Sequence, residues 1–428
     1  MEDSLITTRI KDRPVNRKKL IRRYMLSAFS AVIFGVVACV TFIALEPGVS
    51  GVLHPEEQPS IVEFPEETVD SELNPEDMLL PETPPGNVTV EEVQEIVSQE
   101  IDSKASEAAS MGPEELQSLS MALVNVAREA QGSLVSVLAV MEETDWFDNS
   151  FEASGAFLGV VIADNGLERL VLVRGEGLED AEDLRVVLSG GERVRARVKA
   201  RDERTGLYVV AISHSAMPYS ALEANQPMVL GSSVPRQVEG MPVIALMPQG
   251  GISIGNVMLA SRNLSLPDIN LRMLNTNLYA PENVQGFLIN LKGQLIGVID
   301  QEHAAQDNQG LLCALGMTDL RSLVENLSNG GEFPNLGIIG QDITEEVQKA
   351  QEIPPGVYIV DVEYSSPAMR SGLRPGDIIQ SFDGEDILSF RALTDKLLRA
   401  KTGIEHEFVI LRDSQGEYRE ETYEIELE

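Results

Sequence analysis

Short apolar runs of the β type, separated by turn residues, make up most of the chain between Leu134 and Leu315. Residues 164–166 (Asp-Asn-Gly) and 189–191 (Ser-Gly-Gly) stand between such runs and are clusters that join neighbouring strands. Strands at this density, with few helices, predict an all-β barrel or a pair of barrels. The predicted strands are 134–140, 157–163, 170–173, 184–188, 193–200, 208–212, 242–246 and 255–259.

A hairpin is predicted at residues 287–299. Its two apolar arms, 287–290 and 294–299, are separated by the short turn 291–293 (Leu-Lys-Gly). We expect Gly293 to adopt a positive φ in this turn, since only glycine does so without steric cost. Residues 281–286, just before the hairpin, are the stretch most relevant to possible catalysis.

Helical patterns flank the β region. Pro113 suits the first turn of a helix, which carries apolar positions from Leu116 to Ala127 and ends at Gly132. A second short helix is predicted over 320–327, and the linker 328–331 (Ser-Asn-Gly-Gly) follows it.

Residues 333–428 have the pattern and the size of a small mixed α/β domain. One strand begins at 336–338, and the helix at 390–400 carries Leu393, Leu397 and Leu398 on one side. The other predicted strands are 357–362, 377–382, 407–411 and 420–425.

The N-terminus reads as a membrane anchor. Residues 1–24 are basic, and residues 25–45 contain no charge, which is about the length that a transmembrane helix requires. Basic residues stay on the cytoplasmic side, so the rest of the chain is expected outside the cell membrane. A cleaved signal peptide is the alternative, although the apolar stretch is long for one and lacks a clear cleavage site.

An acidic stalk is predicted over residues 46–112. From Glu46 to Val88 the chain is rich in proline and glutamate and has no lysine or arginine, which is typical of a disordered spacer. Thr89 and Glu92 resemble a capping box, and apolar residues at helical spacing predict a short helix over 90–101. This helix is a candidate self-association element.

Composition excludes several classes of function. The formal net charge of −35 argues against a nucleic-acid partner, because phosphate binding depends on lysine and arginine. The two cysteines, Cys39 and Cys313, imply no disulfide framework. The four histidines are scattered and form no metal-ligand pattern, so neither a metal nor another cofactor is predicted.

Two motifs resemble the HtrA/DegP family. Residues 367–379 contain Pro-Ala, Gly-Leu and Pro-Gly-Asp-Ile-Ile, which match the signature of bacterial PDZ domains, and residues 281–288 align with the nucleophile loop of HtrA proteases. The resemblance covers about residue 114 to the end of the chain. It implies a mainly β fold: a trypsin-like double β-barrel at 113–330, followed by an α/β PDZ domain at 331–428.

The catalytic residues of that family are replaced here. Alignment with the family places Glu176 at the histidine position, Gly206 at the aspartate position and Val284 at the serine position. A valine has no nucleophilic atom and a glycine cannot orient a histidine, so the standard mechanism is lost. Glu282 replaces a glycine of unusual φ, which also puts the oxyanion hole in doubt.

Other nucleophiles are less convincing. Ser232 and Ser233 follow a glycine without a nearby base and fit a plain turn, and Cys313 lies in an apolar run that suggests a buried thiol. His303, just past the hairpin, is more typical of a surface loop than of a catalytic base. His214 and His406 likewise read as loop or edge residues.

The PDZ-like region keeps its binding chemistry. The resemblance implies that a peptide adds as a strand to the sheet edge and that loop N–H groups hold its terminal carboxylate. After Asn335 opens the loop, the residues that the resemblance implies for peptide binding are Leu336, Gly337, Ile338, Leu393 and Leu397. A purely structural role in the core is the alternative for the leucines.

Three functions follow. The favoured one is a membrane-anchored, extracytoplasmic pseudoprotease that binds polypeptide C-termini or unfolded segments and acts as a chaperone-like holder, a sensor or a regulator of an active relative. The second is an active HtrA-type serine endopeptidase in envelope quality control. The third is a structural part of an envelope or spore-related assembly. The resemblance also implies association, as a homotrimer or with an active relative.

Overall fold

The computed structural model describes residues 25, 59–65, 112–144, 150–175, 177–178, 181, 183–281, 283–304, 310–351, 353–414 and 417–428. The chain divides into two compact units, Met1–Gln58 and Pro59–Glu428. Met25 is the one described residue of the first unit, so the basic tail and the predicted membrane span lie outside the described residues. The predicted helix at 90–101 lies outside them as well. In the described part of the chain, no helix combines the length and the apolar character that crossing a membrane requires.

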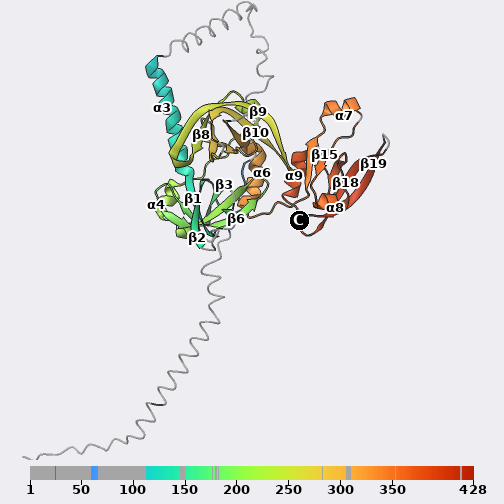
Figure 1. The fold of residues 1–428 in the computed structure, drawn as a ribbon, viewed down its shortest axis with the longest axis horizontal. Helices are drawn as coiled ribbons and strands as arrows, with labels where there is room; N and C mark the ends of the chain where they lie inside the picture. Colours follow the sequence, from blue (N-terminus) through green and yellow to red (C-terminus); the bar gives the residue numbers. More distant parts are fainter. Residues whose placement is uncertain are drawn as a thin grey trace, which may run out of the picture. The chain divides into compact units, whose positions relative to one another are not determined.

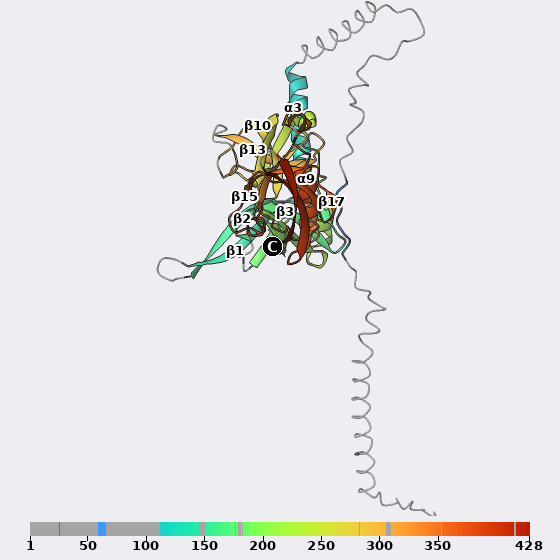
Figure 2. The ribbon, with the colours of Figure 1, turned by 90° about the vertical axis from the view of Figure 1, so that its right-hand side faces the viewer.

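The first body of the second unit is a seven-stranded antiparallel sheet with the strand order β5-β4-β1-β2-β3-β7-β6 (Figure 1). Its central strands β3 and β7 are buried on both faces, which explains their unbroken apolar runs. The paired ends of β1 and β2 project from the sheet (Figure 2). The strands are β1 (Leu134–Thr144), β2 (Ser150–Asp164), β3 (Glu168–Arg174), β4 (Asp183–Val187), β5 (Arg193–Arg195), β6 (Arg197–Asp202) and β7 (Leu207–Ser213).

The second body is a closed six-stranded barrel with the order β10-β13-β12-β11-β8-β9. Two of its strands, β10 and β13, had not been predicted. The sequence had suggested a pair of barrels, and the structure has one closed barrel beside an open sheet. The strands are β8 (Pro242–Met247), β9 (Gly251–Leu266), β10 (Ile269–Tyr279), β11 (Phe287–Ile289), β12 (Leu295–Ile299) and β13 (Leu311–Gly316).

The predicted hairpin is β11–β12. Its turn contains Gly293 at φ 74°, as expected, and the side chain of Asn290 accepts hydrogen bonds from the N–H groups of Lys292 and Gln294 at 2.9 and 3.0 Å. This local network fixes the turn and therefore the register in which β11 pairs with β12.

Helices cover the two bodies. The helix α3 (Pro113–Ala130) leads into β1 through the 3₁₀ turn η2 (Gln131–Ser133), and α6 (Met317–Ser328) follows β13, close to the prediction for both helices. Other short elements are η4 (His214–Ala216), α4 (Tyr219–Ala224), α5 (Pro235–Val238) and η5 (Pro248–Gly250).

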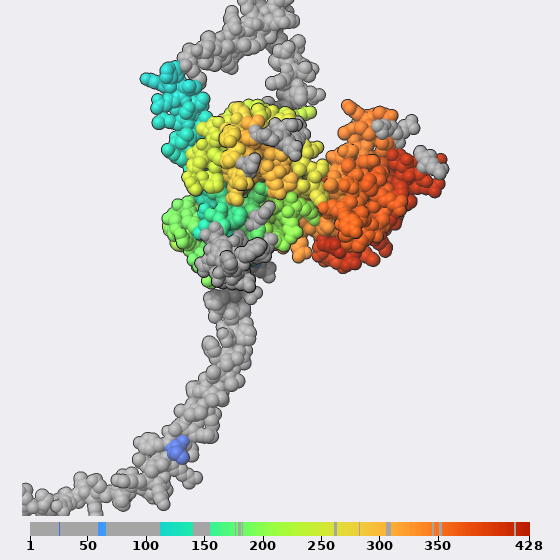
Figure 3. Space-filling view, in the orientation of Figure 1, coloured from blue at the N-terminus to red at the C-terminus, as the bar shows by residue number. Residues whose placement is uncertain are grey.

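The C-terminal module is a five-stranded antiparallel sheet of order β14-β15-β16-β18-β19, with the short β17 paired to β16. It forms a compact body of its own (Figure 3, orange to red). The strand β14 has a single partner strand, and no strand of the module pairs with its other edge. The elements are β14 (Ile338–Asp342), α7 (Glu345–Gln351), β15 (Val357–Val362), α8 (Pro367–Ser371), β16 (Ile378–Phe382), β17 (Glu385–Asp386), α9 (Phe390–Leu397), β18 (Glu405–Ser414) and β19 (Glu417–Glu426).

Residues 59–65 depart from the predicted spacer. The N–H of Val62 donates to the Asn329 side chain at 2.9 Å, and the N–H of Phe64 donates to Glu325 at 3.0 Å. Val62 is 7% exposed and belongs to the hydrophobic cluster that joins the open sheet, the barrel and α6. The alternation of Val62 and Phe64 with a polar residue explains this docking, because one face of an extended segment can be buried.

Candidate functional site

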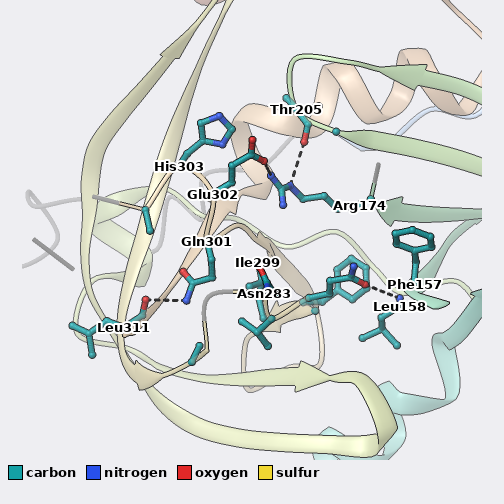
Figure 4. A pocket seen from close by; sticks show the side chains of 18 of the residues that line it. Phe157, Leu158, Arg174, Thr205, Asn283, Ile299, Gln301, Glu302, His303 and Leu311 are labelled. Carbon is teal, nitrogen blue, oxygen red and sulfur yellow. Dashed lines mark hydrogen bonds and ion pairs between the residues drawn. The ribbon is translucent and has the colours of Figure 1, made fainter. Parts of the chain in front are cut away.

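A cleft of about 940 Å³ lies where the open sheet and the barrel meet (Figure 4). Two positions that the sequence aligned with the catalytic triad, Gly206 and Val284, both line it. The third, Glu176, lies outside the described residues, although its neighbour Gly175 also lines the cleft. The cleft is therefore the candidate functional site of the open sheet and the barrel.

The loop that leads into β11 presents a hydrocarbon side chain. Val284 is half-buried and packs against the apolar cluster of the barrel. Its N–H donates to the carbonyl oxygen of Pro281 at 3.2 Å, inside the same loop. An oxyanion hole requires such N–H groups to point to the site where the substrate carbonyl would develop charge. This N–H is already used within the loop.

Gly286 determines how this loop joins the barrel. Its φ is 151°, and a Cβ added there would lie 2.2 Å from the carbonyl oxygen of Leu246 in β8. Only glycine allows this close approach of two backbones. The loop shape is thus imposed by packing against β8, and it persists although the residue two positions earlier carries no hydroxyl.

Gly206 occupies a left-handed position with φ 64°. Its carbonyl oxygen accepts a hydrogen bond from the N–H of Gly175 at 3.1 Å. A Cβ at this position would meet nothing closer than 3.8 Å. Space for a side chain exists, but no carboxylate is present to orient a base.

The charged part of the cleft is an ion cluster centred on the buried Asp300. The guanidinium of Arg174 lies 3.1 Å from Asp300 and 3.0 Å from Glu302. His303 Nδ1 lies 2.8 Å from the other carboxylate oxygen of Asp300, while its own N–H and that of Glu302 donate to Asp300 as well. Arg174 also donates to the carbonyl oxygen of Thr205 at 3.3 Å. The side chains are thus committed to one another (Figure 4).

This cluster is a poor metal site. Asp300, Glu302 and His303 offer ligand atoms within 4.8 Å of one another. The guanidinium of Arg174 contacts both carboxylates and offsets part of their negative charge, so a cation would have to displace it. The His303–Asp300 pair resembles the base and orienting acid of a hydrolase, but such a pair needs a nucleophile.

The described residues that line the cleft include no serine and no cysteine. Their threonine, Thr205, is 1% exposed and donates its hydroxyl to Asp202 at 2.7 Å. The sequence candidates lie elsewhere: Ser233 exchanges hydrogen bonds with Thr318 at 2.8 and 2.9 Å, and Cys313 is a fully buried thiol, as predicted. The described side chains therefore place no nucleophile beside His303.

The other two described histidines have structural roles. His214 lies 3.0 Å from Asp164. His406, predicted as a loop or edge residue, instead lies buried in the inner strand β18, where it stacks on Phe382 and lies 2.7 Å from Asp383.

The loop before β14 holds a carboxylate that belongs to the chain itself. The N–H groups of Leu336, Gly337 and Ile338 donate to the side chain of Asp268, with four distances of 2.9–3.0 Å. Asp268 lies in the two-residue turn between β9 and β10 of the barrel. Leu393 and Leu397, in α9, are fully buried in the core of the C-terminal module.

Arg204, in the loop between β6 and β7 of the open sheet, supports this contact. Its guanidinium lies 3.7 Å from Asp268 and donates to the carbonyl oxygens of Phe333 and Pro334 at 3.3 and 3.4 Å. It also lies 3.9 Å from the centre of the Phe333 ring, in cation–π geometry. Burial raises the pKa of the Asp268 carboxyl, and the charge of Arg204 and the three backbone donors oppose that shift.

Sequence reasoning missed both charged centres. The spacing of Asp300 and His303 could have suggested the pair in the cleft. Pro267-Asp268 is a turn signal that could have located the β9–β10 hairpin. Nothing local, however, predicts that Asp268 meets a loop about seventy residues away.

Comparisons with known proteins agree with this architecture. A PDZ-domain family profile matches residues 334–425. The chain is 26% identical over 276 residues to a probable periplasmic serine endoprotease, DegP-like, of Halomonas elongata, which covers 62% of this chain and 55% of that protein. It is 26% identical over 345 residues to the serine protease Do-like HtrA of Bacillus subtilis, which covers 76% of this chain and 74% of that protein.

A solved structure supports the fold. The HtrA-type protease AlgW with a decapeptide aligns with a TM-score of 0.50 and 20% identity, over 72% of this chain and 98% of that one. The chain spans about half the length of the DegP-like relative, so that protein's activity is not transferred as a whole. The PDZ match, the curated relatives and the shared fold together show that the chain is similar to the HtrA/DegP trypsin-like serine proteases with a PDZ domain.

Proposed function

We propose that this protein is a pseudoprotease of the HtrA type that binds peptides and does not cleave them. The observation that carries the proposal is Val284, a hydrocarbon side chain in the loop where the family places its nucleophile, with its N–H bonded to Pro281. Without an attacking oxygen and an oxyanion hole, the main sources of rate enhancement are missing.

The side chains of the cleft support peptide binding rather than peptide-bond cleavage. Arg174 forms ion pairs with Asp300 and Glu302, and the hydroxyl of Thr205 donates a hydrogen bond to Asp202. The fold can still accept an extended segment, because the cleft is open and lined by both polar and apolar groups. An active endopeptidase, as the names of the relatives would suggest, requires a nucleophile that the described lining residues do not supply.

Peptide binding is assigned to the PDZ module. The outer edge of β14, with which no strand of the module pairs, suits strand addition. The N–H groups of Leu336, Gly337 and Ile338 converge on one carboxylate, which is the chemistry that a peptide C-terminus offers. Leu393 and Leu397 lie in the helix beside this edge and are proposed to border the pocket for the last side chain.

The proposed setting is extracytoplasmic, with residues 25–45 as the membrane anchor. The relatives named periplasmic are consistent with a location outside the cytoplasm. In this setting the protein would hold or sense chain ends of other polypeptides, alone or beside an active relative.

The test uses the full-length protein and short fluorescein-labelled peptides that differ in their last residue. Peptides with a free C-terminus should bind, and the same peptides with an amidated C-terminus should not, because the amide removes the charge that the loop recognises. Mass spectrometry of the mixtures, and of mixtures with casein, should show no cleavage. Cleavage that a serine-directed inhibitor abolishes would contradict the proposal.

A further inference from the structure

The N–H loop of the PDZ module is not empty, since Asp268 fills it with a side-chain carboxylate. Both oxygens of this carboxylate accept hydrogen bonds, one from Leu336 and Gly337 and the other from Gly337 and Ile338. A terminal carboxylate of a peptide would use the same donors, because they are the loop's means of recognising negative charge. The two ligands therefore exclude each other.

The backbone contacts of the β9–β10 hairpin also resemble those that a bound peptide would make. The N–H of Asp268 donates to the carbonyl oxygen of Ile338 at 2.8 Å, and the side chain of Asn270 donates to the carbonyl oxygen of Gly340 at 2.9 Å. Both acceptors belong to β14, the edge strand to which a peptide would add. The tip of the β9–β10 hairpin thus follows part of the path of an added strand.

The hairpin is also held from the other side of the groove. Thr394, in α9, donates its hydroxyl to the carbonyl oxygen of Asp268 at 2.7 Å. The contacts of β10 with α9 and of β9 with β14 place the hairpin between the two elements that would flank a bound peptide (Figure 1). Asp268 is fully buried there.

The turn is built with backbone strain at the residue that makes these contacts. Asp268 has φ 63°, a left-handed conformation that is uncommon for residues other than glycine, asparagine and aspartate. Such strain persists where surrounding contacts determine it. The contacts that do so here are those with the PDZ loop, β14 and α9.

We propose that Asp268 is an intramolecular substitute for a peptide C-terminus, which closes the PDZ groove until a chain end of another polypeptide displaces the β9–β10 hairpin. This inference rests on the proposed peptide-binding function and adds its regulation. When the groove is closed in most molecules, the apparent affinity for peptide equals the affinity of the open form multiplied by the fraction of molecules that are open.

Displacement of the β9–β10 hairpin would also change contacts at the cleft, because two parts of the chain border both the docked turn and the cleft. Arg204 lies near Asp268 and also lines the cleft, and β10 runs from the docked turn to Tyr279, beside the cleft residue Ala280. A peptide at the PDZ module therefore releases contacts that border the cleft.

The test compares full-length wild type with Asp268→Asn, which removes the charge, and Asp268→Gly, which removes the side chain and suits a positive φ. The matched control is Asp386→Asn, an exposed residue of β17. Binding of the labelled peptides is measured by fluorescence anisotropy. Both Asp268 variants should bind the best peptide about tenfold or more tightly than wild type, and the control should bind like wild type.

Hydrogen exchange gives a second measurement that needs no peptide. The N–H groups of 336–338 should exchange slowly in wild type and rapidly in Asp268→Gly. Adding peptide to wild type should leave 336–338 protected, because the peptide carboxylate takes over the same donors, and should speed exchange at 266–270. Equal peptide affinity in wild type and both variants would overturn the closed groove alone. Absence of binding in every variant would overturn the proposed function, and the proposal of a closed groove with it.

Discussion

The N–H of Val284 donates a hydrogen bond to the carbonyl oxygen of Pro281 at 3.2 Å. This bond closes the loop on itself at the position where a trypsin-like protease would present its nucleophile. The side chain above it is a hydrocarbon that packs against the barrel core. Loop geometry and side-chain chemistry thus agree in favouring a cleft that holds without cutting.

Restoring the hydroxyl alone should not restore reactivity. We expect Val284→Ser to react with a fluorophosphonate probe no faster than the matched control Val284→Ala, because no base is placed to activate the new serine. In-gel fluorescence of probe-treated protein measures this. Probe labelling of Val284→Ser well above that of Val284→Ala would indicate that His303 reaches the loop as a base.

The loop before β11 should tolerate no side chain at Gly286. Gly286→Ala places a Cβ 2.2 Å from the carbonyl oxygen of Leu246, so we expect a loss of more than about 3 kcal/mol in the free energy of unfolding. The matched control is Gly293→Ala, which also has a positive φ but meets nothing within 4 Å and should cost about 1 kcal/mol. Thermal unfolding compares the two, and equal losses would refute the packing argument.

The ion cluster of the cleft should be sensitive to the loss of its cation. Arg174→Gln leaves Asp300, which is fully buried, without its counter-charge, and we expect destabilisation of about 3 kcal/mol. Arg185→Gln is the control, since Arg185 is 46% exposed and pairs with Asp183 at the surface. It should change stability by less than about 1 kcal/mol. Similar unfolding midpoints for both variants would show that the cluster is not a stabilising unit.

One salt bridge of the open sheet should make stability depend on acid pH. Burial alone would raise the pKa of Glu168, but the hydrogen bonds and charges of Lys199 and Arg197 outweigh it and lower the pKa below its usual value. A carboxyl whose pKa is lower in the folded state than in the unfolded state stabilises the folded protein at pH values above its unfolded-state pKa. This stabilisation is lost as the pH falls through the folded-state pKa.

Glu168→Gln should therefore lower the unfolding midpoint at neutral pH, by the equivalent of about 1 kcal/mol, and the difference from wild type should vanish once the pH has fallen through the folded-state pKa of Glu168. Glu223→Gln, at an exposed position of α4, is the control and should follow wild type throughout. A difference for Glu168→Gln that stays constant across the acid range would contradict the assignment.

Local patterns predicted most of the elements because the physics there is local. The turn of the β11–β12 hairpin depends on Asn290 and Gly293, which are neighbours in sequence, and α6 depends on apolar residues at helical spacing. The strand β10 was missed although Ile269, Leu271 and Met273 are buried in alternation with polar residues, a signal that could have been read.

The site was less predictable because its contacts are long-range. The sequence could show that Val284 and Gly206 lack catalytic atoms, but the ion cluster joins Arg174 to Asp300, and the closed groove joins Asp268 to Gly337. Neither pair leaves a periodic pattern. A short apolar alternation around Val62 was also outweighed by the acidic composition of the predicted stalk, and the structure places this segment against α6.

The central claim is that this relative of serine proteases lacks a working nucleophile, and covalent labelling tests it most directly. Full-length protein is incubated with a fluorophosphonate probe, beside an active serine protease as positive control, and analysed by intact-mass spectrometry. The account predicts an unmodified chain. A stoichiometric adduct that maps to a residue of the cleft would contradict it.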